Sequence, residues 1–462
     1  MIRPIKIFLY FLLTAALVLF FDRALNQADI SLIPPPGMFT ENATDSVNPL
    51  KIAPGEEIRM QEPSVVPDTE KTEIRDTSRG HQLSHIDTVL TAPPLFRQLY
   101  RNFIRQAEQS QQNHKTVRVL HLGDSQIEAD RISKILRKHF QEKYGGEGPG
   151  LIMPYDPLQI NASARLSNQG TWELAYSYRE HQYPGPIPFG FSGKAAWFRD
   201  REASFRIAPR SSKQAFQKAR LLTASPVNEF HLRVSSDNKI LGDTLIGASQ
   251  SLQITSFQPP DSPSEMTFRF SASTSPLIHG IALDGQGGVA VDNLAMRGRP
   301  WAGFRLASGE LLEATARHLN IGMIILQFGT NVLPTKTDDY NFYRIHYSRE
   351  LRRIRDLLPQ IPVLVIGVQA SATQEEGEVV PMLHASKISE AQKSAALDFG
   401  MGFYDLHKSM GGKRGAIKWA REGLMLSDYM HFSARGAQKT GNQIWEALTT
   451  LHEDSLKNRD RN

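Results

Sequence analysis

Three polar residues have the types and local settings that acyl-transfer chemistry requires. Ser125 follows an apolar run at 117–122 and precedes apolar residues at helical spacing, so it is expected at a turn between a strand and a helix. Asp428 and His431 stand close together near the other end of the chain, so the carboxylate can hold the imidazole. Histidine can take the proton of a serine hydroxyl near neutral pH, and a carboxylate fixes its tautomer. The three residues predict a Ser-His-Asp triad.

Two intermediate segments supply candidate donors for a negatively charged oxygen. The apolar run at 323–328 is followed by Asn331, whose side-chain amide can donate a hydrogen bond to a developing oxyanion. The apolar segment 289–298 ends in Gly298, whose backbone N–H is a second donor, and the N–H of Ser125 is a third. An isolated Asp-x-x-His pattern is more often a surface turn, but these two segments favour the catalytic interpretation.

Together the four segments resemble the sequence blocks of the SGNH (GDSL-like) hydrolase superfamily. In that family's order, the matching residues are 123–125 for block I, 293–298 for block II, 329–331 for block III and 428–431 for block V. Gln126 stands where leucine is frequent in block I, and Ala295 stands where the first glycine of block II is usual. Neither departure removes a reacting group, but both leave the substrate class open.

The resemblance implies a role for each candidate residue. Ser125 would be the nucleophile, and Asp428 and His431 would complete the triad. The oxyanion hole would consist of the backbone N–H groups of Ser125 and Gly298 with the side chain of Asn331. The family fold that accompanies these roles is an SGNH (flavodoxin-like) α/β domain.

The composition of the chain limits the class of protein and the kinds of site that it can contain. The chain has 462 residues, 40% of them hydrophobic, and a net charge of +5, which fits a globular protein longer than one ordinary domain. Basic residues are densest at 344–355, where apolar residues recur at helical spacing, so we predict a solvated helix face and no nucleic-acid partner. With no cysteine, disulfides, thiolate metal sites and a cysteine nucleophile are excluded. No metal or cofactor is expected.

The N-terminal segment predicts attachment to a membrane. Arg3 and Lys6 precede an apolar run at 7–21, which Asp22 ends. This run is shorter than the roughly 17–25 residues of a typical spanning helix and close to the length of a signal-peptide core. Because no good cleavage site follows, we favour a signal anchor at 1–22 in the inner membrane, with the catalytic domain in the periplasm. A cleaved signal and a soluble periplasmic protein form the alternative.

The remaining patterns predict an α/β domain in two parts. Residues 23–94 are rich in proline and polar residues and predict an extended or disordered tether. The SGNH domain is expected at 95–157 and 287–453, followed by a tail at 454–462. Its strands are expected at 117–122, 289–294, 322–328, 363–369 and 402–405. Helices are expected at 95–111, 127–143, 308–319, 341–358, 384–398 and 434–451. This alternation predicts a parallel sheet of about five strands with helices on both faces.

Residues 158–286, between the two parts, show the alternating pattern of β-strands separated by turn residues, and predict an inserted β-sandwich. The clearest strand patterns are 173–178, 203–207, 230–234, 251–255 and 266–271. An insert at this place resembles the periplasmic peptidoglycan O-acetylesterases, which carry a carbohydrate-binding-like module between blocks I and II. The glycine-rich connectors at 145–150 and 279–283 are similar to that branch as well.

These observations lead us to expect a serine esterase that removes O-acetyl groups from a cell-envelope polysaccharide, with peptidoglycan favoured. Its partners would be the acetylated glycan and the membrane. An O-acetyltransferase would use the same triad with a membrane acetyl-transfer partner, and sequence does not separate the two. A non-catalytic glycan-binding scaffold is the alternative from a different class of protein.

Overall fold

The computed structural model describes residues 89–459 except 158–162, 183–185, 212–213 and 226. The predicted signal anchor at 1–22 lies outside these residues, as does the predicted tether up to residue 88. Across the part of the chain that is described, no helix has the length and apolar composition needed to cross a membrane. The end of the predicted tether, Leu90–Thr91, forms a short strand in the central sheet.

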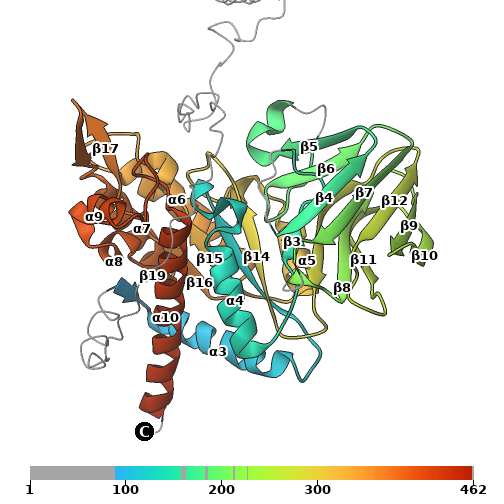
Figure 1. Cartoon of the computed structure of the whole chain (residues 1–462), viewed down its shortest axis with the longest axis horizontal. Coiled ribbons are helices and arrows are strands. Elements are labelled where there is room, and N and C mark those ends of the chain that lie inside the picture. Colours follow the sequence, from blue (N-terminus) through green and yellow to red (C-terminus); the bar gives the residue numbers. More distant parts are fainter. Residues whose placement is uncertain (1–88, 158–162, 183–185, 212–213, 226, 460–462) are drawn as a thin grey trace, which may run out of the picture. The chain divides into compact units, whose positions relative to one another are not determined.

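A six-stranded sheet positions the candidate residues (Figure 1). Its strands, in spatial order, are β1 (Leu90–Thr91), β19 (Gly402–Tyr404), β16 (Val363–Ile366), β15 (Ile321–Gln327), β2 (Val117–Gly123) and β14 (Val289–Ala295). The five strands from β19 to β14 are parallel, and only β1 pairs in the antiparallel sense. The predicted parallel sheet is confirmed, and β1 is an addition at its edge. The parallel strands are mainly apolar and buried, because both faces of the sheet are covered.

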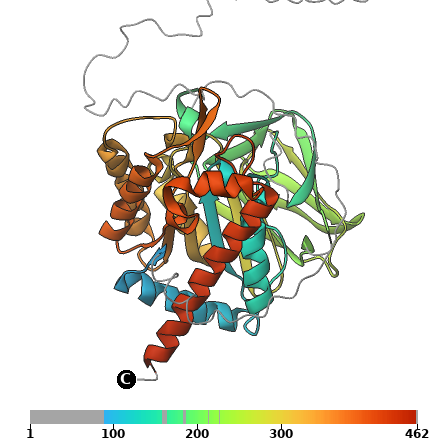
Figure 2. The same cartoon turned by 60° about the vertical axis from the view of Figure 1, so that its left-hand side comes forward.

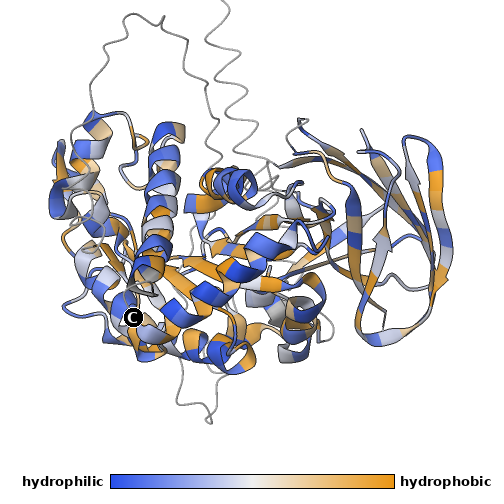
Figure 3. Cartoon of the chain, turned by 90° about the horizontal axis from the view of Figure 1, so that it is seen from below, coloured by the Kyte–Doolittle hydropathy of each residue, from blue (hydrophilic) through white to orange (hydrophobic). Residues whose placement is uncertain are grey.

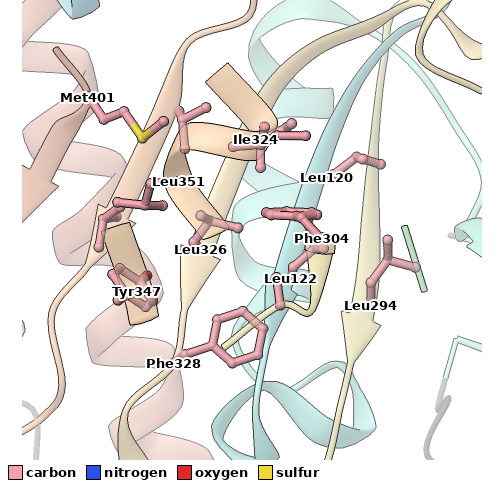
Figure 4. Packing of buried hydrophobic residues seen from close by; sticks show 14 of the residues in the cluster. Leu120, Leu122, Leu294, Phe304, Ile324, Leu326, Phe328, Tyr347, Leu351 and Met401 are labelled. Carbon is pink, nitrogen blue, oxygen red and sulfur yellow. The ribbon is translucent and has the colours of Figure 1, made fainter. Parts of the chain in front are cut away.

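Helices cover the two faces of this sheet. One face carries α3 (Pro94–Ser110), α4 (Ser133–Tyr144), α9 (Gly415–Arg421) and α10 (Ala434–Arg459). The other face carries α5 (Gly309–Leu319), α6 (Asn341–Leu357) and α7 (Ala385–Asp398). Successive residues of β2 divide between the layers, because Val119 packs toward α3 and α4 whereas Leu120 packs toward α5 and α6. Figure 4 shows residues of this second layer, among them Leu120, Leu326, Tyr347 and Leu351. In Figure 3 the central strands are mainly orange, and the helices carry both colours.

Two helix boundaries differ from the prediction. The expected helix at 127–143 is interrupted, because Ala129 and Asp130 have φ of 52° and 61°, and α4 begins only at Ser133. The Asp130 carboxylate binds the guanidinium of Arg137 and accepts a hydrogen bond from Ser163 Oγ at 2.5 Å, which holds this irregular turn. At the C-terminus, α10 continues through most of the predicted tail to Arg459 and lies alongside α4 (Figure 2).

The inserted region consists of two antiparallel sheets. One contains β10 (Lys239–Ile246), β9 (Phe230–Ser236), β12 (Met266–Ala272), β7 (Glu202–Pro209) and β4 (Ala164–Gln169) in that order. The other contains β11 (Ser249–Phe257), β8 (Lys218–Ser225), β13 (Leu277–Asp284), β6 (Lys194–Phe198) and β5 (Trp172–Tyr176). A short strand, β3 (Gly150–Ile152), pairs with β13, so strand pairing begins before the predicted boundary at 158. One buried aromatic cluster, which includes Phe205, Phe268 and Phe270, is shared by both sheets.

A buried charge network joins the insert to the parallel sheet. Arg118 of β2 lies 2.6 Å from Asp284 of β13 and also binds Asp292 of β14, and all three side chains are fully buried. Arg220 of β8 approaches Asp284 to 2.8 Å, and Asp292 accepts a hydrogen bond from the N–H of Leu151 at 2.8 Å. Burial favours a protonated Asp284, but Arg118 and Arg220 hold its pKa below the ordinary value. A fixed buried carboxylate therefore stands at the end of β13, where the chain leaves the insert.

Candidate active site

The turn after β2 places Ser125 beside the loops that follow β14 and β15. Gly123 leaves little space, since a Cβ there would lie 2.7 Å from the carbonyl oxygen of Gln327. Asp124 is fully buried and caps the 3-10 helix Ser125–Asp130. Its two carboxylate oxygens accept hydrogen bonds from the N–H groups of Gln126 and Thr330, each at 3.0 Å. Asp124 thereby connects the turn at Ser125 to the loop that carries the third predicted block.

The structure brings the three predicted triad residues into one chain of hydrogen bonds. Ser125 Oγ lies 2.8 Å from His431 Nε2, although the two residues are 306 positions apart in the sequence. His431 Nδ1 lies 2.6 Å from Asp428 Oδ2. Ser125 is half-buried, and the His431 side chain is 23% exposed, so the hydroxyl and the imidazole remain accessible from solvent. This arrangement can move a proton from the hydroxyl to the imidazole while the carboxylate holds the ring.

Asp428 is held as an anion by its own loop. Oδ1 accepts hydrogen bonds from the N–H groups of Met430 and His431, both at 2.9 Å. Burial alone raises the pKa of Asp428, but the hydrogen bonds from the His431 ring and from these N–H groups outweigh it and lower the pKa to about 2. The carboxylate therefore stays ionised well into the acid range, and it is the acceptor that the imidazole requires.

The loop that carries Asp428 and His431 closes on itself. The N–H of Leu426 donates to the carbonyl oxygen of His431 at 2.8 Å, and Met425 and Phe432 form an isolated antiparallel bridge. Tyr429 occupies the left-handed region with φ of 55°, which lets the chain reverse between the aspartate and the histidine. Asp428 and His431 are thus fixed to each other by local contacts.

Gln126 fixes this loop against the nucleophile turn. Its side chain is buried, and Nε2 donates to the carbonyl oxygen of Met430 at 2.6 Å. Its Oε1 accepts from the N–H of Phe432 at 3.4 Å. The two contacts flank His431 on both sides along the chain. Sequence reasoning noted Gln126 only as a departure from the family pattern and missed this function in the structure.

The two other predicted oxyanion residues lie on loops that meet beside the turn. The N–H of Met296, after β14, donates to the carbonyl oxygen of Gly123 at 2.7 Å, which brings the loop of Gly298 to the nucleophile turn. Asn331 Nδ2 donates to the carbonyl oxygen of Arg299 at 3.0 Å, so the two loops are joined to each other. Gly298 has φ of 77°, and a Cβ built there would meet nothing within 4 Å, so open space lies beside it.

A buried network of hydrogen-bonded polar side chains lies next to the turn that carries Ser125. His121 of β2 lies 3.1 Å from Gln327 Oε1 through Nε2 and 2.9 Å from Ser133 Oγ through Nδ1. Asn293 donates to Ser133 Oγ and to the carbonyl oxygen of Ile127, each at 2.7 Å. Burial lowers the pKa of His121 to about 4, so this imidazole is neutral and structural near neutral pH. In the described part of the chain, no group of His, Asp and Glu side chains could hold a metal ion.

Comparison with solved structures identifies the fold. A structure of a peptidoglycan O-acetylesterase is similar with a TM-score of 0.63 and 19% sequence identity, covering 79% of this chain and 99% of that chain. The chain thus shares the fold of that structure, an α/β domain with additional antiparallel sheets, as expected from the resemblance of the sequence blocks. Because nearly the whole of that chain is covered, the likeness includes both an α/β domain and additional antiparallel sheets.

Weaker similarities were also found. An acetyl xylan esterase has a TM-score of 0.26 at 16% identity, covering 34% of this chain and 81% of that chain. A family two carbohydrate esterase from Cellvibrio japonicus has a TM-score of 0.18 at 12% identity, covering 51% and 85%. Scores this low establish no shared fold. No protein-family model matches the sequence, and neither does any curated protein.

Proposed function

We propose that this chain is a serine esterase that removes O-acetyl groups from a cell-envelope glycan, with peptidoglycan as the favoured substrate. The observation that carries the proposal is the continuous hydrogen-bonded chain from Ser125 through His431 to Asp428. The shared fold with a peptidoglycan O-acetylesterase supports the choice of substrate class. An N-terminal anchor at 1–22 would keep the enzyme on the periplasmic side of the inner membrane, where such a glycan lies.

The geometry supports a two-step acyl transfer. His431 Nε2 takes the proton from Ser125 Oγ as this oxygen attacks the acetyl carbonyl carbon, and Asp428 stabilises the imidazolium. The sugar oxygen then leaves with the proton from His431, which yields an acetyl-enzyme and the free sugar hydroxyl. A water molecule next gives a proton to His431 and attacks the acetyl carbonyl carbon. Ser125 Oγ then leaves this carbon and takes the proton back from His431, which releases the acetate product and restores the serine.

Three donors would stabilise the negatively charged oxygen in each step. They are the N–H groups of Ser125 and Gly298 and the side-chain amide of Asn331. Asn331 Nδ2 carries two hydrogens, and only one is needed for the bond to the Arg299 carbonyl oxygen. Because that bond fixes the amide, the second hydrogen is oriented before the substrate arrives, which is the condition under which such donors contribute most.

Acetate release from O-acetylated peptidoglycan tests the proposal. We expect Ser125→Ala to abolish release, and Asn331→Ala to lower kcat by roughly 100–1,000-fold. Ser386→Ala, at a half-buried serine at the start of α7, is the control and should behave as wild type. A bare glycan offered in the same reaction distinguishes hydrolysis from acetyl transfer to a sugar, the activity of an O-acetyltransferase. Unchanged acetate release by Ser125→Ala would refute the assignment.

A further inference from the structure

The outer face of one insert sheet carries a polar hollow remote from the triad. In the sheet β10-β9-β12-β7-β4, inward residues such as Phe205 and Phe268 belong to the aromatic cluster, so the alternate residues face outward. This sheet includes the strands drawn at the right-hand edge of Figure 1. A hollow of about 670 Å³ opens on it, a volume within the usual range of small-ligand sites. Its lining includes Gln169, Glu202, Ser204, His231, Arg233, Arg269 and Ser271.

The strand register places two arginines directly opposite each other in this hollow. Arg269 of β12 pairs in register with Arg233 of β9 on one side and with Ser204 of β7 on the other. Like charges directly opposite on neighbouring strands are destabilising. If this pair served the stability of the fold alone, each arginine would be expected to have an acidic partner.

Only one of the two arginines has an acidic partner. Arg233 binds Asp243 with Nε and Nη2 both 2.7 Å from Oδ2, and the same carboxylate lies 2.6 Å from His231 Nε2. The side chain of Arg269 forms no hydrogen bond or ion pair with any residue that the structure describes, although Glu202 lines the same hollow. An exposed guanidinium is therefore left with all of its donors available beside a second positive charge.

We propose that this hollow binds a carboxylate group of an acidic glycan. Arg269 holds the carboxylate through its planar pair of N–H donors, and Arg233 adds the second positive charge. Gln169, Ser204 and Ser271 supply uncharged hydrogen-bonding groups for sugar hydroxyls. Phe270 turns its side chain into the buried cluster, so the lining residues offer no phenylalanine, tyrosine or tryptophan ring for stacking. Recognition by charge and hydrogen bonds selects acidic over neutral sugars.

The choice of a cell-wall glycan as ligand rests on the proposed function, whereas the charged site itself does not. Such a glycan offers carboxylates from two sources, the lactyl group of muramic acid and the attached peptides. The test therefore uses full-length protein carrying Ser125→Ala and three probes of equal backbone length. They are N-acetylglucosamine–N-acetylmuramic acid hexasaccharide without peptides, the same hexasaccharide with peptides, and neutral chitohexaose. Binding is measured by isothermal titration calorimetry at low and at high salt.

We expect at least one carboxylate-bearing probe to bind about tenfold or more tightly than chitohexaose, and the difference to shrink at high salt. Arg269→Gln should weaken that binding by roughly tenfold or more. Arg206→Gln is the matched control, because Arg206 is an exposed arginine on the same sheet, outside the hollow, that lies 3.6 Å from Glu265. It should change the affinity by less than about twofold. Preference for one probe identifies the source of the carboxylate.

Thermal unfolding separates this role from a structural one. Because Arg269 faces Arg233, Arg269→Gln should leave Tm unchanged or raise it while binding is lost. Equal affinity for chitohexaose, or wild-type binding by Arg269→Gln, would overturn the proposal. With Ser125 restored, Arg206→Gln should hydrolyse a small acetate ester as wild type does. An absence of hydrolysis in both proteins would contradict the esterase assignment and leave the binding result standing.

Discussion

At the scale of single residues, the site depends on a side chain that takes no part in the chemistry. Gln126 contacts the backbone on both sides of His431 and belongs to the same turn as the nucleophile. Its amide therefore sets the distance between Ser125 Oγ and His431 Nε2, which is 2.8 Å. A leucine of similar size could fill the space but could neither donate to Met430 nor accept from Phe432. We regard Gln126 as a positioning residue.

Replacing Gln126 should impair turnover more than substrate binding. We expect Gln126→Leu to lower kcat by about 10- to 100-fold, because small displacements of a general base are costly, with less than about a threefold change in KM. Steady-state kinetics on a small acetate ester measure both constants. Gln374→Leu, at an exposed glutamine of the hairpin strand Ala372–Glu375, is the control. A kcat within twofold of wild type would show that the loop holds His431 without this side chain.

Residue type and order were enough to predict the triad but not its support. Ser125, Asp428 and His431 are reactive types in recognisable settings, and the structure brings them together. The bonds from Gln126 go to backbone atoms of a loop some 300 residues away, and backbone atoms leave no signature in sequence. The departure from the family pattern at position 126 was the only signal available.

At the scale of elements, buried carboxylates connect helices to the loops around the site. Glu350 of α6 accepts hydrogen bonds from the N–H groups of Phe304 and Arg305, at the 3-10 turn Phe304–Leu306 that follows the Gly298 loop. Its side chain is buried, and burial, opposed by these hydrogen bonds and by Arg299, raises its pKa to about 7. The folded chain thus holds this proton more tightly than the unfolded chain does.

This shift predicts a pH-dependent stability. Below pH 4.5 the contribution of Glu350 to the free energy of unfolding is at its highest. This contribution declines as pH rises toward 7, and above pH 7 it is lower by up to about 3 kcal/mol. Glu350→Gln cannot titrate, so the wild type should lose stability relative to this variant between pH 5 and pH 8. Urea unfolding at both pH values measures the difference, with exposed Glu313→Gln as the control. Parallel stability curves for wild type and Glu350→Gln would contradict this prediction.

Sequence patterns predicted the parallel sheet better than the insert. The strands of the parallel sheet are mainly apolar and buried, and all five were predicted. In the insert, the five predicted patterns correspond to β5, β7, β9, β11 and β12. The edge strands β4 and β10 were missed because their side chains are mostly exposed and show little alternation. The interior strands β6, β8 and β13 were missed because they are buried along most of their length and lack alternation too. The interruption at Ala129 and Asp130 was missed for another reason: it is held by contacts to Arg137 and Ser163, which only the fold brings near.

At the scale of the whole molecule, buried charged side chains join the insert to the parallel sheet. The guanidinium of Arg118 binds Asp284 of the insert and Asp292 of the parallel sheet, so a single side chain links the insert to that sheet. The sequence gives no sign of this link, because Arg118 is more than 160 positions from either aspartate and none of the three stands in a catalytic block.

Removing Arg118 should destabilise the protein strongly, since two buried carboxylates lose their partner. We expect Arg118→Leu to lower the free energy of unfolding by about 3–5 kcal/mol, with a smaller loss for Arg118→Lys, which retains the charge. Arg199→Leu breaks an exposed ion pair with Glu173 in the same insert and should cost less than about 1 kcal/mol. Chemical denaturation measures the free energy of unfolding of all three variants. Equal losses of this free energy for Arg118→Leu and Arg199→Leu would show that the buried ion pairs of Arg118 add no stability.

The self-closed loop at 424–433 has a consequence for how the proposed catalytic machinery can fail. Since Asp428 and His431 are bound to each other within that loop, a fluctuation that shifts the loop carries base and carboxylate away together. The imidazole keeps its tautomer throughout the excursion, and only its reach to the hydroxyl is lost. Return of the loop restores a competent enzyme in a single movement, with no proton to rearrange.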